Sequence, residues 1–217
     1  YITELMKEVV LEVPDEISYR NLEKLFKKID GRKDDTNSAE VFKFDLRESS
    51  YLSPSGAVAL TAFRDHLIDN GVNTRAIIAK WGRRFYRISK VFGMFPSVDT
   101  TVDNAYKKRI SNYAVGVERC ISSEECEDAQ AEIMEEVTDR VACQEGTEAA
   151  LEYMIGEIWD NAGVHGYECY DSRQYPEPIY MGAFSYSSEV EVAILDRGQG
   201  IHSSLRSVQE YQNLSAR

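Results

Sequence analysis

Apolar residues recur along this chain in two alternating patterns, and the alternation limits the folds open to it. Residues 8–13 and 41–46 are short and rich in apolar and β-branched residues, as strands are. Residues 22–29 and 60–67 instead have their apolar side chains at helical spacing, and Gly71 follows as a stop signal. Strands that alternate with helices in this way predict an α/β fold.

The same alternation continues in the second half of the chain. Residues 113–119 predict a strand, and Ser122 with Glu125 matches the capping box that begins many helices. Residues 179–184 and 189–195 predict two further strands, the second with apolar side chains at every other position. The second half is therefore also expected to be α/β.

A helix is expected between these strands, beginning near Gly146. Its apolar residues recur at helical spacing, and we expect it to bury Leu151, Met154, Ile155 and Ile158. Residues 166–178 include two prolines, which favour a loop there. Residues 96–112 have the weakest pattern for regular structure. We place the domain boundary in that segment, which gives two α/β domains, residues 1–105 and 106–217.

The charge balance excludes one class of partner. The chain carries a net charge of −12 at pH 7, which repels the phosphate backbone of nucleic acids. A local exception is a basic cluster that has two interpretations, a docking patch or a solvated helix face. Its members are Lys80, Arg83, Arg84, Arg87 and Lys90.

Hydropathy and cysteine spacing give expectations about location and metals. No apolar run approaches the about 20 residues that cross a bilayer, so no membrane partner is expected. The four cysteines include no C-x-x-C pair, so zinc is not indicated. No secretion signal is visible, and we expect free thiols in a reducing cytoplasm.

The strongest local motif begins at Asp196, directly after a predicted strand, in the sequence Asp-Arg-Gly-Gln-Gly-Ile. A carboxylate at the end of a strand can accept a hydrogen bond from the exocyclic amine of a base. Gly198 and Gly200 would let the backbone pass close to a ligand, because they carry no Cβ. The alternative is a glycine turn between two structural elements.

A second motif lies on the predicted helix that precedes it. Glu157 and Asn161 are four residues apart, so both lie on one stripe of that helix, which His165 would extend. Glu157 could act as a general base, and Asn161 offers a side-chain oxygen to a hard cation such as Mg²⁺. The alternative is a polar stripe on an amphipathic helix.

Together the two motifs resemble the GHKL family of ATPases, which includes histidine kinases, gyrases, chaperones and MutL. ALEYMIGEIWDNAGVHG, residues 150–166, resembles the helix that carries the N-box of that family. VAILDRGQGI, residues 192–201, resembles its first glycine box. The resemblance covers roughly residues 110–217 and implies an α/β sandwich that binds ATP with Mg²⁺.

The resemblance also implies a role for each matching residue. Asp196 would hold the adenine amine, and Gly198, Gly200 and Ile201 would shape the purine pocket. Asn161 would coordinate the Mg²⁺ that bridges the phosphates, and Glu157 would orient or deprotonate the nucleophile. In the family a second glycine box and a lid follow. The chain ends at Arg217 before such a segment, so we expect this ATP-binding domain to be incomplete.

The first half is similar, more faintly, to the STAS domain of anti-anti-sigma factors. The similar segment, FDLRESSYLSPSGAVALTAFRDHLIDNG, spans residues 44–71. In that family a serine or threonine in the loop before the helix is phosphorylated by a GHKL-type kinase. Ser55 is the closest match, followed by Ser53, although Ser53 stands where the family usually has Asp. The alternative role for Ser55 is a helix N-cap, which needs the same residue type.

These resemblances lead to one functional expectation and two alternatives. We expect an ATP-binding signalling regulator, of the anti-sigma type of serine/threonine kinase, with a STAS-like domain fused to it. It would act with a regulatory protein partner. The first alternative is a nucleotide sensor without catalysis, and the second is an ATPase that forms a homodimer when ATP binds. Glu157 separates them, because both catalytic mechanisms need its carboxylate and the sensor does not.

Overall fold

The structure is a computed structural model that describes residues 7–32, 39–77, 114–140, 146–165, 174–185 and 189–198. It has a mixed α/β architecture, as predicted. The chain divides into two units, residues 1–117 and 118–217, and each is described by itself. The predicted boundary near residue 105 lies outside the described residues, as does the basic cluster that begins at Lys80.

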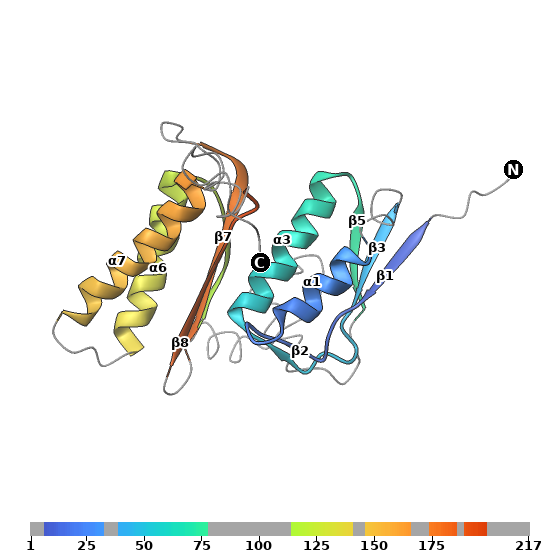
Figure 1. The fold of residues 1–217 in the computed structure, drawn as a ribbon, viewed down its shortest axis with the longest axis horizontal. Coiled ribbons are helices and arrows are strands. Elements are labelled where there is room, and N and C mark those ends of the chain that lie inside the picture. Colours follow the sequence, from blue (N-terminus) through green and yellow to red (C-terminus); the bar gives the residue numbers. More distant parts are fainter. Residues whose placement is uncertain are drawn as a thin grey trace, which may run out of the picture. The chain divides into compact units, whose positions relative to one another are not determined.

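A parallel sheet of three strands forms the centre of the first unit, in the order β1-β3-β5 (Figure 1). These strands are β1 (Glu8–Glu12), β3 (Val41–Asp45) and β5 (Asn73–Ile77). Helices α1 (Leu22–Asp30) and α3 (Pro54–Asp69) connect them, as parallel neighbours require a crossover. The predicted alternation of strands and helices is therefore confirmed in this unit.

Aromatic side chains fill the space between β3 and α3. Phe42 and Phe44 are fully buried, and the ring of Phe63 meets both of them edge-on, at centroid distances of 5.5 and 5.9 Å. Burying a side chain of this size stabilises a fold by roughly 1.5–3 kcal/mol. The β-branched and aromatic run of β3 thus anchors the helix that follows it.

The start of α3 differs from the expectation for Ser55. Ser53 is the N-cap, and its hydroxyl accepts a hydrogen bond from the Gly56 N–H at 3.4 Å. Pro54 occupies the first helical turn, where the missing N–H costs nothing, so it belongs to the helix rather than to a loop. Ser55 is therefore not the cap. A two-strand sheet of β2 (Glu16–Ile17) and β4 (Tyr51–Leu52) lies beside this turn.

The second unit is a three-stranded sheet with two helices on one face (Figure 1). The strand order is β6-β7-β8, and β7 and β8 are antiparallel. The elements follow one another as β6 (Ala114–Ser122), α6 (Ser123–Arg140), α7 (Thr147–Asp160), the π-helical turn η1 (Asn161–His165), β7 (Gln174–Ser185) and β8 (Val190–Leu195). Its core includes Ile133 and Val137 of α6, and Tyr180 and Met181 of β7.

The predicted capping box is present at the junction of β6 and α6 in a modified form, because the carboxylate reaches the N–H of Ile121 rather than that of Ser122. The Glu125 N–H donates to the Ser122 hydroxyl at 3.3 Å, and the Glu125 carboxylate accepts from the Ile121 N–H at 2.6 Å. Two backbone donors are satisfied in this way, and α6 starts directly after β6 without a loop.

Strand β7 begins earlier than predicted. It starts at Gln174, so Pro176 and Pro178 lie in a strand, and the expectation of a loop was wrong for residues 174–178. The register with β8 runs only from Tyr180 to Ser185. Both prolines therefore lie outside the part of β7 that pairs with β8, and their missing N–H groups interrupt no bond to that strand.

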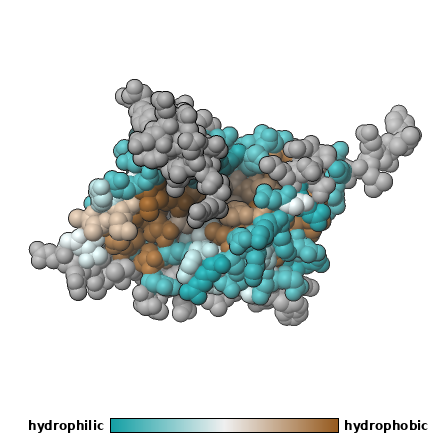
Figure 2. Space-filling model, viewed as in Figure 1, coloured by the Kyte–Doolittle hydropathy of each residue, from teal (hydrophilic) through white to brown (hydrophobic). Residues whose placement is uncertain are grey.

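Helix α7 buries fewer apolar side chains than predicted. Ile155 is buried and Leu151 is half-buried, but Met154 is 57% exposed and Ile158 is 50% exposed. The expectation was wrong for these two because only a narrow stripe of α7 faces α6 and the sheet. Figure 2 shows the resulting apolar surface over the helical layer of this unit.

Candidate functional site

The polar stripe of α7 has the arrangement that its spacing predicts. Glu157 and Asn161 are both exposed, and Tyr153 precedes Glu157 by one turn on the same face. The Glu157 carboxylate, beside the Tyr153 phenol, raises the pKa of Tyr153 above its usual value. The phenol thus holds the carboxylate along the helix surface, at the position where the sequence predicts a general base.

Asn161 lies where the helix changes its hydrogen-bonding pattern. Its side-chain amide nitrogen donates to the Glu157 carbonyl oxygen at 2.7 Å, and the π-helical turn η1 begins at this residue. The bond directs the amide nitrogen back to the helix, and the amide oxygen is the atom that a hard cation would take. Single π turns within helices frequently occur at functional sites. Of His165, which ends η1, only the backbone is described.

Asp196 directly follows the last residue of β8, as predicted. Its Oδ1 atom accepts a hydrogen bond from the Gly198 N–H at 2.8 Å, which forms a tight turn. The neighbouring Arg197 forms an ion pair with Glu177 of β7 at 3.0 Å and ties this turn to the sheet. Oδ2, the second oxygen of Asp196, is the atom that a base would use. Gly200 and Ile201 lie outside the described residues.

Both motifs are adjacent to the same strand. The turn η1, which carries Asn161, contacts β7. The last residue of β8, Leu195, pairs with Tyr180 of β7, so Asp196 follows at the N-terminal part of that strand. The second unit therefore places the two motifs, distant in the sequence, around β7.

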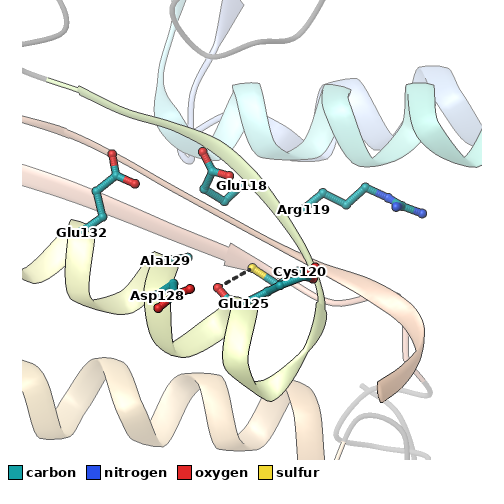
Figure 3. Close-up of a pocket in the computed structure, with 7 residues that line it drawn as sticks. All are labelled: Glu118, Arg119, Cys120, Glu125, Asp128, Ala129 and Glu132. Atoms are coloured by element: carbon teal, nitrogen blue, oxygen red, sulfur yellow. Dashed lines mark hydrogen bonds between the residues drawn. The ribbon is translucent and has the colours of Figure 1, made fainter. Parts of the chain in front are cut away.

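A separate pocket lies between β6 and α6, and sequence reasoning did not predict it. Its volume is about 280 Å³, and no predicted site residue lines it. Figure 3 shows its lining, which is Glu118, Arg119, Cys120, Glu125, Asp128, Ala129 and Glu132. Burial, and then the charge of Glu132, raise the pKa of Glu118. The acidic residues spaced along α6 could have indicated this pocket from the sequence. Only the tertiary structure, however, places Glu118 of β6 opposite them.

The serines of the first unit differ sharply in exposure. Ser53 is fully buried, whereas Ser55 is half-buried in the first turn of α3. Their hydroxyl groups are hydrogen-bonded to each other at 2.8 Å. Of the two candidates for phosphorylation, Ser55 is thus the more accessible, and Ser53 has a structural role as the cap.

Two kinds of feature are not found among the described residues. Within these ranges no group of three or more His, Cys, Asp or Glu side chains is arranged to hold a metal ion. No described helix combines the length and the apolar character that a membrane crossing needs. Comparisons with protein-family models, with curated proteins and with solved structures found no match to this chain. The functional interpretation therefore rests on its own residues.

Proposed function

We propose that the second unit binds an adenine nucleotide with Mg²⁺ and belongs to a GHKL-type signalling regulator. The observation that carries this proposal is the exposed pair Glu157 and Asn161, on one face of α7 at the start of the π turn. A carboxylate and an amide oxygen on one exposed face suit the phosphate end of a nucleotide, where charge must be neutralised by a cation.

Asp196 would recognise the base. One of its oxygens is used by the Gly198 N–H, which orients the carboxylate and leaves the other oxygen to accept from an exocyclic amine. Such a bond to a charged acceptor contributes roughly 1.5–3 kcal/mol. The absence of a Cβ at Gly198 would let a purine approach the turn closely. Gly200 and Ile201 would complete this pocket.

The first unit would be the regulatory partner of the nucleotide site. We propose that it is STAS-like, with Ser55 as the phosphoryl acceptor of a serine/threonine kinase of the anti-sigma type. The supporting observation is the half-buried Ser55 hydroxyl at the start of the 16-residue helix α3. A phosphate there would be favoured by the positive end of the helix dipole.

A non-catalytic nucleotide sensor is the second candidate. It is favoured by the position of the Tyr153 phenol beside the Glu157 carboxylate. A carboxylate oxygen that faces a neighbouring phenol has one acceptor position fewer for the proton of a nucleophile. In this case Asn161 and Asp196 would still bind the nucleotide, and Glu157 would be a surface carboxylate.

Nucleotide binding by the full chain tests the proposal. Thermal unfolding is measured with Mg·ATP, Mg·ADP and Mg·GTP, each at 100 times its dissociation constant or at the highest soluble concentration. Saturation at 100 times the constant would add about 2.7 kcal/mol of stability, a shift of roughly 5–10 °C for a chain of this size. We expect the shift with ATP and ADP and not with GTP. Equal melting temperatures with and without all three nucleotides would overturn the proposal.

A further inference from the structure

Two buried cysteines meet at the junction of β6 and α6. Cys120 is near the end of the strand, and Cys126 is in the first turn of the helix. Both are buried free thiols, and each sulfur shifts the pKa of the other, so the two side chains lie close together. The Cys120 sulfur also lies 3.6 Å from the carbonyl oxygen of Glu125, the residue before Cys126. The two thiols are therefore direct neighbours.

The local backbone holds this pair together. The capping box of Ser122 and Glu125 lies between the two cysteines and sets the angle at which the helix leaves the strand. Because the strand and the helix are contiguous, no flexible loop separates the thiols. Little chain entropy remains to be lost when the two sulfurs are linked.

The pKa values of the two thiols are shifted in opposite directions. The hydrogen bond from Cys120 lowers the pKa of Cys126 against the effect of burial, and Trp159 helps to lower it. The same bond, with burial and the charges of Cys126, Glu118 and Glu125, raises the pKa of Cys120. A thiolate beside a thiol is the arrangement that oxidises most readily, since the thiolate is the nucleophile.

A route to the pair exists from outside. Cys120 lines the pocket of about 280 Å³ between β6 and α6, and its sulfur is visible in Figure 3. A pocket of this volume admits a molecule as small as hydrogen peroxide. Peroxide in the pocket would meet the side chain of Cys120, which lies beside Cys126.

We propose that Cys120 and Cys126 are a site of oxidative modification and form a reversible disulfide with hydrogen peroxide as the oxidant. The Cys126 thiolate attacks one peroxide oxygen, the O–O bond breaks, and hydroxide leaves. The Cys120 sulfur then attacks the resulting sulfenic acid. The S–S bond forms, the S–O bond breaks, and a second hydroxide leaves. With the two thiol protons, the two hydroxides become two waters, and two electrons pass from the sulfurs to the peroxide.

Trp159 connects the cysteine pair with α7, because it lies on the same helix as Glu157. Its indole nitrogen is buried and has no hydrogen-bond partner among the described residues. The indole nevertheless lies close enough to the Cys126 sulfur to lower the pKa of that thiol. In the disulfide that sulfur can no longer carry a negative charge. The disulfide is therefore expected to change the surroundings of Trp159, whether or not α7 binds a nucleotide.

Disulfide mapping tests the proposal on the full chain. A variant with Cys143→Ser and Cys169→Ser retains only the buried pair. After peroxide treatment we expect both thiols to resist alkylation in denaturant, a peptide linking Cys120 to Cys126, and full recovery of both thiols with dithiothreitol. Two alkylatable thiols after treatment, or loss of thiols through over-oxidation without a linked peptide, would overturn the proposal.

Single substitutions in the same background separate the roles of the two sulfurs. Cys120→Ala should trap Cys126 as a sulfenic acid that reacts with dimedone, and Cys126→Ala should leave Cys120 reduced. With Trp81→Phe added, Trp159 is the remaining tryptophan and can be excited selectively over the tyrosines, since the chain has two tryptophans. Its emission should change on oxidation, reverse with dithiothreitol, and stay constant in the Cys126→Ala variant. If these alanine variants fail to fold, disulfide mapping of the parent still decides the question.

Discussion

Gly56 of α3 lies against Ile17 of β2 so closely that no side chain fits between them. A Cβ at Gly56 would be 2.6 Å from the Ile17 carbonyl oxygen and 2.5 Å from its Cγ2 atom. Atoms at these separations overlap, and the backbone oxygen cannot rotate away. The close approach seats the start of α3 beside the small sheet of β2 and β4.

Gly56→Ala is therefore expected to destabilise the first unit. Replacing glycine by alanine inside a helix normally stabilises by up to about 1 kcal/mol. Overpacking typically costs about 1–3 kcal/mol, so the clash with Ile17 outweighs that gain. Gly156→Ala in α7 is the matched control, because among the described residues its Cβ would meet only Gln130 Nε2 at 3.6 Å. Thermal unfolding should show a lower midpoint for the first variant and an unchanged or higher one for the control.

Thr61→Val is expected to leave stability unchanged or to raise it. The Thr61 hydroxyl is buried in α3 and has no hydrogen-bond partner among the residues that the structure describes. An unsatisfied buried polar group costs about 1–3 kcal/mol, and valine has nearly the same shape. Ser53→Ala is the contrasting control, since it removes a helix cap and should lose about 1 kcal/mol. A marked loss of stability in Thr61→Val, measured by denaturant unfolding, would reveal a hidden partner for this hydroxyl.

Acid should weaken the first unit in part through Asp45. The Arg47 side chain, hydrogen-bonded to the Asp45 carboxylate at 2.8 Å, lowers the pKa of that carboxyl below its usual value. A lowered pKa in the folded state gives stability that is complete above the ordinary value of 3.8 and is lost as pH falls through the folded value. Asp45→Asn should remove this part of the acid dependence, measured as melting temperature from pH 7 to pH 2. An identical acid profile in the variant would exclude the contribution.

Asp196→Asn should weaken the binding of adenine nucleotides. Asparagine keeps an oxygen for the Gly198 N–H, so the turn is preserved while the charged acceptor is lost. Loss of a bond worth about 1.5–3 kcal/mol lowers affinity roughly 10- to 150-fold. Glu148→Gln, an exposed carboxylate in the first turn of α7, is the control with the same change in net charge. Calorimetry should show the loss only for Asp196→Asn, and equal affinities in both variants would show that Asp196 does not hold the base.

Glu157→Ala separates catalysis from sensing. If Glu157 acts on the nucleophile, nucleotide binding should persist while hydrolysis or phosphoryl transfer falls by about 10²–10⁴-fold. Asn161→Ala should instead lose the Mg²⁺-dependent part of the affinity, because a cation ligand is removed. Binding and turnover are measured for both variants, with transfer to Ser55 followed by phosphopeptide mapping. A parent protein that binds ATP without turning it over would favour the sensor.

The periodicity of this chain determined where most of its longer helices and strands lie, because repeating apolar positions and local caps act over a few residues. β3, α3 and the capping box at Ser122 were predictable for that reason. The tertiary structure decided which surfaces meet. Ile155 is buried while Met154 is exposed on the same helix, and Ser53 rather than Ser55 caps α3. Cys120 and Cys126 come close together because the first turn of α6 contacts the end of β6. Local spacing specifies the face of an element, whereas the partner of that face depends on the angle at which two elements pack.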